Sequence, residues 1–410
     1  MVISPNAWLA AFFAIALLAP PLPFAFGNSG PHPAAALAAL GVAAGLVRLS
    51  EWRFHRGALE GVLIFFFATL AISLIPAALY SGPQIAMASL ARVGLAGISL
   101  YVFFYVSAGP GRKSEVSTRL LYWVAVASAA FACVDFFYQF PAPAGFGPQF
   151  IWLDAGPHRR AQGLFYEAGT LGNFCAFFLV MTAVALVRRV GNRIALLAGG
   201  AIFAAALIFS YSRSSLAGVV LALASLAVME RKRPVVRRVA LWMGGALVAL
   251  LIALFRFFPA YAEVYWLRLR VSLGWALASN GVVLSGRVES WQTLAAFLIA
   301  HPWHAILGIG YKTLPYSNFI GQPVVADNMY LSTLVETGIA GLAALIAMNF
   351  AILRAGYRTA RSIDSRKSFF GTWIFCFWIA ESAQMLSADV LTFWRVLPLY
   401  FWTLAMAVRK

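Results

Sequence analysis

Apolar runs of about 20 residues follow one another along almost the whole of this 410-residue chain, and they constrain its fold more than any other feature. A run of that length is what an α-helix needs to cross the hydrocarbon core of a bilayer. Only 11% of the residues are charged, whereas soluble domains have roughly a quarter. The sequence therefore predicts an all-α polytopic membrane protein.

The spacing of these runs predicts about twelve membrane-spanning helices. We expect them near residues 7–26, 33–47, 58–80, 85–107, 120–140, 168–187, 194–211, 215–229, 239–258, 338–355, 371–388 and 393–408. The interval 259–337 is too long for a simple connector, and it carries most of the polar residues. We therefore divide the chain into helices over 1–258, a large loop over 259–337 and helices over 338–410.

Basic residues alternate between the connections, which predicts the orientation of the helices. With twelve spans, 21 of the 31 Lys and Arg residues fall on one side of the membrane. Under the positive-inside rule that side is cytoplasmic, so both termini are expected there and the large loop is expected in the periplasm. The predicted location is the inner membrane of a bacterium.

The net charge of +17 does not point to nucleic acid, because the basic residues stand in short clusters between apolar runs. Several cations nevertheless fall on the outer face, where basic residues are scarce. Guanidinium groups bind phosphate oxygens in a bidentate manner, so an anionic headgroup or a diphosphate is the expected partner. These outer cations are Arg159, Arg160, Arg213, Arg268, Arg270, Arg287 and Lys312. The roles of Arg268 and Arg270, and of Arg92 and Asp135 elsewhere, stay open.

The sequence predicts neither a metal nor a cofactor. The three cysteines lie within apolar runs, without the spacing of metal ligands or of a disulfide framework. His301 and His304 flank Pro302, which favours packing or capping over metal binding. Gly308-Ile309-Gly310 lacks the third glycine of a dinucleotide fingerprint and is expected to form a turn. The first apolar run lacks a basic leader and a clear cleavage site, so we expect a retained span.

One stretch of the large loop has the spacing of an amphipathic helix. Between Arg287 and Ala300 the apolar side chains recur at intervals of three and four residues, and Pro302 ends the pattern. Arg287 stands in the first turn, where it either pairs with Glu289 or faces a ligand. We favour the second interpretation.

Other polar residues have two interpretations each. Asp327-Asn328 opens an apolar run, so it is either a helix N-cap or a carboxylate that acts as general base, and the two do not exclude each other. Arg160 at the start of a span can snorkel to the interface. Arg213 sits in a very short outer hairpin and is expected to face a polar cavity or a ligand.

Four motifs occur in a fixed order over about residues 150–345. They are Arg160-x-x-Gly163-x-Phe165 followed by Glu167; Ser212-Arg213-Ser214; Gly286-Arg287-x-x-x-Trp291 followed by His301-Pro302 and Leu307-Gly308-Ile309-Gly310; and Asp327-Asn328-x-Tyr330-Leu331 with Glu336-x-Gly338-x-x-Gly341. In order and topology this set resembles the bacterial O-antigen ligase and polymerase superfamily.

The resemblance implies a C-type glycosyltransferase fold and transfer of a glycan from undecaprenyl diphosphate to an acceptor hydroxyl on the periplasmic face, with inversion and without metal or nucleotide. Asp327 and Arg287 would be catalytic, Asp327 as general base. Arg160 and Arg213 would join Arg287 in holding the diphosphate. We also expect substrate contacts from Glu167, Lys312, Asn328 and Tyr330.

The ligases of this superfamily usually have His-Asn where this chain has Asp327-Asn328. The departure favours a polymerase of lipid-linked repeat units, with a glycan acceptor and a chain-length regulator as a candidate partner. The alternative is a ligase that transfers finished glycan to a lipid A core. An alternative of another class is a secondary transporter or flippase, although the polar residues gather in one loop instead of at the midplane.

Overall fold

The computed structural model describes residues 4–22, 31–54, 57–113, 117–140, 148–153, 156–231 and 287–409, with isolated positions between 245 and 270. The expected helix 239–258 and the first part of the expected loop 259–337, including Arg268, lie largely outside the described residues. The following description concerns the described part of the chain.

Each expected span that falls on described residues coincides with a helix. The helices in this part of the chain are α1 (Pro5–Leu18), α2 (Pro33–Val47), α3 (Ala58–Ile72), α4 (Leu74–Ser81), α5 (Pro83–Ser107), α6 (Thr118–Tyr138), α7 (Ala168–Arg188), α8 (Arg193–Phe209), α9 (Arg213–Met229), α12 (Arg287–Ala300), α13 (Trp303–Leu307), α14 (Met329–Ala360), α15 (Ser365–Gln384) and α16 (Leu397–Val408). A short hairpin pairs β1 (Phe150–Leu153) with β2 (Gly156–Arg159).

Five segments are long and apolar enough to cross a membrane by length and composition: Ala58–Ser81, Pro83–Ser107, Thr118–Tyr138, Ala168–Arg188 and Met329–Ala360. Five more apolar helices are shorter. The chain is thus a mostly helical protein with membrane-spanning helices, as the composition predicts.

Several helix boundaries differ from the expectation, and two of the differences have a clear local reason. α1 ends at Leu18, before the prolines at 20 and 21, which have no N–H to continue a helix. α14 begins at Met329 and continues through Gly338, which has non-helical dihedral angles (φ 73°) and kinks it. The expected boundary between loop and helix at 337/338 therefore falls on this kink.

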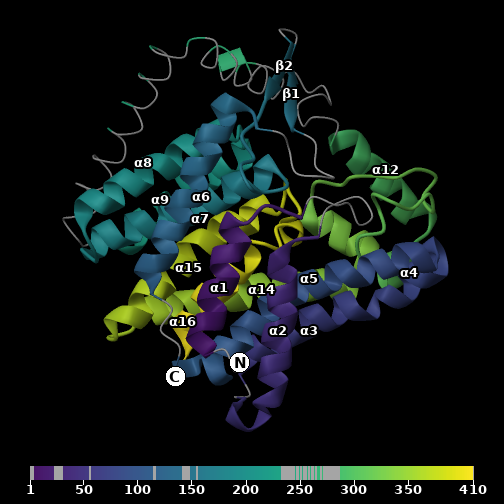
Figure 1. Ribbon diagram of the computed structural model, residues 1–410. Helices are drawn as coiled ribbons and strands as arrows, with labels where there is room; N and C mark the ends of the chain where they lie inside the picture. Colours follow the sequence, from purple (N-terminus) through teal and green to yellow (C-terminus); the bar gives the residue numbers. More distant parts are fainter. Residues whose placement is uncertain are drawn as a thin grey trace.

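Helix α7 forms the centre of the bundle. Its 18-residue apolar window is 94% buried inside the protein, so this span is covered by other helices instead of by lipid. It packs against α8, α9 and α15, and α15 in turn packs against α14 and α16 (Figure 1). Aromatic rings fill the contact, with Phe177 beside Trp373, Phe377 and Tyr400. This rigid centre carries the beginnings of α7 and α9 at one end of the bundle.

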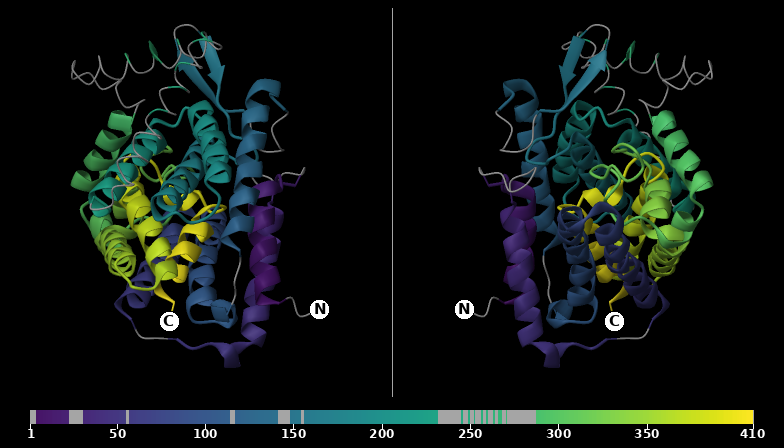
Figure 2. Two further views of the ribbon diagram at one scale, coloured as in Figure 1. Left: turned by 90° about the vertical axis from the view of Figure 1, so that its left-hand side faces the viewer. Right: turned by 90° about the vertical axis from the view of Figure 1, so that its right-hand side faces the viewer.

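The two ends of the bundle differ. Figure 2 places the beginning of α1 and the end of α16 at the end opposite to the β1–β2 hairpin. The hairpin, the beginning of α9 and the first residues of α12 lie at the other end, together with the last turn of α15. We call this the cavity end, because the cavity described below lies there.

Candidate functional site

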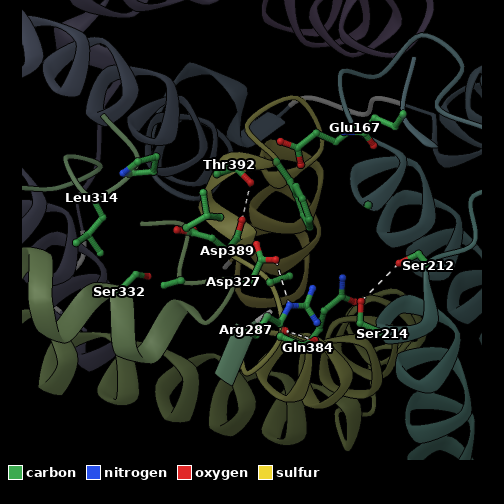
Figure 3. Close-up of a pocket in the computed structure, with 18 of the residues that line it drawn as sticks. Glu167, Ser212, Ser214, Arg287, Leu314, Asp327, Ser332, Gln384, Asp389 and Thr392 are labelled. Atoms are coloured by element: carbon green, nitrogen blue, oxygen red, sulfur yellow. Dashed lines mark hydrogen bonds and ion pairs between the residues drawn. The ribbon is translucent and has the colours of Figure 1, made fainter. Parts of the chain in front are cut away.

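A cavity of about 910 Å³ opens at the cavity end between α5, α7, α9, α12, α14 and the segment after α15. Its wall is strongly polar, with five basic and four acidic side chains among its lining residues. The basic residues are Arg92, Arg160, Arg213, Arg287 and Lys312, and the acidic residues are Glu167, Asp327, Glu336 and Asp389. Figure 3 shows several of them converging on a common space.

Arg160 is held at the cavity wall by the segment that follows β2. Its backbone N–H donates to the Gln149 carbonyl at 2.8 Å, and its Nε donates to the Ser210 carbonyl at 2.8 Å. Gly163 adopts a left-handed φ of 55°, and an added Cβ would come within 2.7 Å of the Ala132 Cβ on α6. Phe165 is buried. The glycine and the phenylalanine therefore seat this segment against the bundle, while the arginine faces the cavity.

Arg213 is the first residue of α9, and the tight turn before it aims it at the same cavity. Ser212 caps the helix, because its Oγ accepts from the Ser215 N–H, and the two hydroxyls are 2.8 Å apart. The turn packs on α7 at Gly172, where a Cβ would lie 2.6 Å from the Ser212 Cβ. The Ser-Arg-Ser motif is thus a capped turn that presents a cation at the start of a helix, where the dipole also favours anions.

Arg287 and Asp327 form an ion pair across the cavity, with 3.1 Å between Nε and Oδ2 (Figure 3). The pair joins the first turn of α12 to the residue before the N-cap of α14. Arg287 therefore pairs with the distant Asp327, and the local pairing with Glu289 weighed from the sequence is not the one formed. The side chains are 26% and 46% exposed, so both remain open to a ligand.

Lys312 reaches the cavity from a segment that crosses the bundle. Ile309 and Gly310 donate backbone hydrogen bonds to the carbonyls of Val335 and Glu336 at 3.0 and 2.8 Å. The Tyr311 N–H donates to Ser73 Oγ at 3.1 Å. The largely buried Lys312 ammonium then forms an ion pair with Asp389, which follows α15.

Arg92 brings the membrane-spanning helix α5 into the cavity wall. Its guanidinium lies 4.1 Å from the centre of the Tyr316 ring and donates to the Lys312 carbonyl at 3.3 Å. A charged group on a spanning helix is costly unless it faces a polar space, and here it does. The role that the sequence leaves open for Arg92 is therefore at this cavity.

Glu167 lies at the N-terminus of α7 and lines the cavity opposite Ser212 and Ser214 (Figure 3). Desolvation raises the pKa of its carboxyl above the ordinary value. The Lys312 ammonium opposes this shift in the Glu167 pKa, whereas the charges of Asp327 and Asp389 reinforce it. Glu167 therefore takes up a proton more readily than an exposed glutamate does.

Gln384 of the cavity wall belongs to a buried network of polar groups. Gln384 donates to Ser215 Oγ at 3.3 Å and accepts from Asn173 Nδ2 at 3.2 Å. Asn173 also donates to the buried Glu381 carboxyl at 2.5 Å. These bonds join α7, α9 and α15, so they hold the helix that carries Arg213 in register with the helix that carries Glu167.

Three residues of the wall have a backbone conformation that side chains disfavour. Tyr211, Lys312 and Asp327 have φ angles of 51°, 58° and 44°, in the left-handed region. Such residues cost of order 1–3 kcal/mol each and concentrate at functional sites. Each directly precedes or carries a polar group of the cavity, so the strained turns aim side chains into it.

Two of the residues expected to contact substrate lie outside the lining of this cavity. The side chain of Asn328 is the N-cap of α14 and accepts from the Leu331 N–H at 3.1 Å. The Tyr330 hydroxyl donates to the Ser382 carbonyl at 2.9 Å. The structure thus brings together Arg160, Glu167, Arg213, Arg287, Lys312 and Asp327, while substrate contacts by Asn328 and Tyr330 stay predictions.

Sequence reasoning left several wall residues without a role. Asp389 is one of them, and it pairs with Lys312. Glu336 was part of a motif, and its Oε1 accepts from the Leu314 N–H at 3.3 Å within the wall. Polar residues at 384, 387, 389 and 392 separate two apolar runs. This separation was the sequence signal from which this side of the cavity could have been predicted.

His301 and His304 pack in an aromatic cluster. The His304 ring lies 5.0 Å from that of Tyr80 and 5.4 Å from that of Phe297. No group of three or more metal-ligating side chains occurs among the described residues. The packing interpretation of these histidines accounts for their positions.

Comparison with known proteins identifies the domain that contains most of this site. Residues 198–346 match the family model described as Wzy_C, O-antigen ligase. This part, about a third of the chain, is similar to the O-antigen ligase family. The matched range includes Arg213, Arg287, Lys312 and Asp327, and it confirms the resemblance to the O-antigen ligase and polymerase superfamily. Members of this family are glycosyltransferase-like enzymes. No curated protein matches the chain.

Proposed function

We propose that this protein transfers a glycan from undecaprenyl diphosphate to an acceptor hydroxyl at the periplasmic face of the inner membrane. The observation that carries the proposal is the cavity lined by Arg160, Arg213, Arg287 and the Asp327 carboxylate, of which all but Arg160 lie in the range that matches the O-antigen ligase model. The cations supply the partner for a diphosphate, and the carboxylate supplies a base.

The donor would bind with its diphosphate against the three guanidinium groups. Each can donate two parallel hydrogen bonds to phosphate oxygens. The diphosphate gains negative charge as its bond to the sugar breaks, so these donors bind the transition state more tightly than the ground state. Lys312 and Arg92, on the other side of the cavity, would orient the glycan or the acceptor.

The acceptor hydroxyl would give its proton to Asp327. Oδ2 of this carboxylate accepts from Arg287, and we assign Oδ1 to the acceptor. The acceptor oxygen forms a bond to the anomeric carbon, the bond from that carbon to the diphosphate breaks, and its electron pair leaves with undecaprenyl diphosphate. The attack comes from the face opposite to the leaving group, so the configuration inverts.

Polymerisation of lipid-linked repeat units is the preferred form of this reaction, because Asp327 stands where ligases usually have histidine. The family description favours the second candidate, a ligase that uses a lipid A core as acceptor. Both candidates share the donor and the cavity, and they differ only in the acceptor.

The deciding experiment supplies undecaprenyl diphosphate-linked oligosaccharide to the purified protein in nanodiscs, without lipid A core. A ladder of products at multiples of the repeat, absent with Asp327→Asn, supports the polymerase. Product that forms only after lipid A core is added supports the ligase. If no product forms in either assay and the protein remains monodisperse, the result would instead support a transporter function.

A further inference from the structure

The turn between α12 and α13 exposes a compact set of large apolar side chains, which we call the elbow. Its residues are Ile299, Trp303, Ile306 and Leu307, with exposed fractions of 82%, 73%, 53% and 61%. Within α13, Ile306 and Leu307 follow Trp303 by three and four residues and therefore share its face, and Ile299 stands in the last turn of α12 just before the break. Burying such side chains is worth about 1.5–3 kcal/mol each, so this face calls for an apolar partner.

The elbow is continuous with surfaces of spanning helices. The carbonyl of Ile306 lies directly against Gly338 of α14, and the next residue, Ile339, is 61% exposed. On the other side, the His304 ring contacts Tyr80 near the end of α4, where Leu79 is 74% exposed. Figure 1 shows α12 and α4 on the same flank of the bundle.

We infer that the elbow inserts into the bilayer interface at the cavity end, as a monotopic anchor for the helix that carries Arg287. α4 ends at Ser81 and the elbow contacts α14 at its Gly338 kink, so the elbow lies near the end of one spanning helix and beside the kink of another. Tryptophan is favoured at this depth, and an exposed apolar face of a short helix is suited to it. The partner is therefore the lipid of that leaflet.

This inference changes the picture of the polar segment. The segment 259–337 was expected as a loop in the aqueous periplasm, whereas the elbow would bring its described part back to the membrane. The inference concerns how this segment meets the membrane and does not depend on the reaction proposed for the cavity.

The test places a nitroxide spin label at single introduced cysteines in the full chain in nanodiscs. Cys133→Ala removes the half-buried native thiol, whereas Cys175 and Cys376 are buried and stay, with the unsubstituted parent as labelling background. The label replaces Trp303 or Ile306 in the elbow. Phe350→Cys, 64% exposed on the spanning part of α14, is the lipid control, and Gln292→Cys, exposed higher on α12, is the water control.

Relaxation by oxygen, which concentrates in lipid, is compared with relaxation by a water-soluble nickel chelate. We expect the oxygen-to-nickel ratio at 303 and 306 to exceed that at 292 several-fold and to approach that at 350. A ratio equal to that at 292 would place the elbow in water and overturn the inference. Low accessibility to both reagents would show that protein covers the elbow, and that also overturns it.

Discussion

At the scale of single residues, the cavity depends on charges that are held in pairs. Arg287 with Asp327 and Lys312 with Asp389 each join elements that are far apart in the chain. An ion pair as exposed as Arg287–Asp327 contributes about 0–1 kcal/mol to the stability of the fold. We therefore expect the two side chains to serve mainly in ligand binding and proton transfer. Substitutions should therefore change activity much more than folding.

Replacing Asp327 by asparagine should lower kcat by roughly 10²–10⁴-fold, because the acceptor proton loses its base. The donor KM should change little, since Arg287 remains. Arg287→Ala should lower kcat by roughly 10²–10³-fold through loss of charge stabilisation. Steady-state kinetics on purified protein would measure both values.

The matched control is Glu289→Gln, on the same first turn of α12 but exposed. It should keep activity within about twofold and unfold at the same temperature, because a surface substitution away from special features changes stability by about 0.5 kcal/mol or less. If Glu289→Gln lowered kcat as much as Arg287→Ala does, the catalytic role assigned to Arg287 would be wrong.

Glu167 should give the cavity a pH dependence. Because the pKa of its carboxyl is raised, it takes up a proton as the pH falls through a range above that of ordinary glutamates. Protonation removes a negative charge that repels the donor diphosphate. The donor KM should therefore fall on acidification and rise on alkalinisation. In Glu167→Gln the KM should be low throughout and its pH profile flat, and a profile unchanged from the parent would refute this role.

At the scale of elements, the walls of the cavity are positioned by close backbone contacts. Gly308 and Gly338 both have left-handed φ angles, 74° and 73°, and the backbone beside each glycine occupies the space of its missing Cβ. This contact joins the segment that carries Lys312 to the segment that carries Glu336. Only glycine permits both the conformation and the approach.

Gly338→Ala should therefore destabilise the protein strongly, because a Cβ would clash with the Ile306 carbonyl in addition to about 1–2 kcal/mol of backbone strain. Gly321→Ala is the control, since Gly321 also has a positive φ (95°) but has open space around it. Thermal unfolding at one scan rate should show a larger shift for Gly338→Ala. Equal shifts would mean that strain alone, without the clash, matters at Gly338.

The sequence predicted the positions of the helices and pointed to most of the cations that line the cavity, and both predictions rest on the same physical property of lipid. Lipid excludes charge, so apolar length identified the helices, and misplaced cations such as Arg213 indicated a polar space. Arg159 is an exception, because it pairs with Asp135 instead of lining the cavity. Sequence reasoning failed where the determinant was a tertiary contact. Arg287 pairs with Asp327 instead of Glu289, and Lys312 pairs with Asp389. Both pairings depend on how segments that are distant in the sequence pack together. Likewise, the sequence predicted a helix that begins at Gly338, whereas the structure has a kink there inside the longer helix α14.

At the scale of the whole molecule, the two ends of the bundle have different chemistry. One end holds the strained turns and charged cavity, and the other holds the connections rich in arginine, such as the one between α14 and α15. From this asymmetry the positive-inside rule predicts that the cavity faces outward.

Cysteine labelling in intact cells should test this orientation. Ile363→Cys, in the fully exposed connection between α14 and α15, should react with a membrane-impermeant maleimide only after the inner membrane is permeabilised. Gln322→Cys, exposed at the cavity end, should react without that step once the outer membrane is open. The reverse labelling pattern would show that the predicted orientation is wrong and that the cavity faces the cytoplasm.

The glycine contact also bears on where the chain can tolerate substitution. Gly308 and Gly338 are separated by a long stretch of chain. The Glu336 carbonyl occupies the Cβ position of Gly308 and the Ile306 carbonyl occupies that of Gly338, so neither segment can shift alone. The stretch between them is held at both ends, and its exposed tip from Asn318 to Pro323 lies outside this contact. A substitution confined to that tip should therefore leave the contact between the two segments in place.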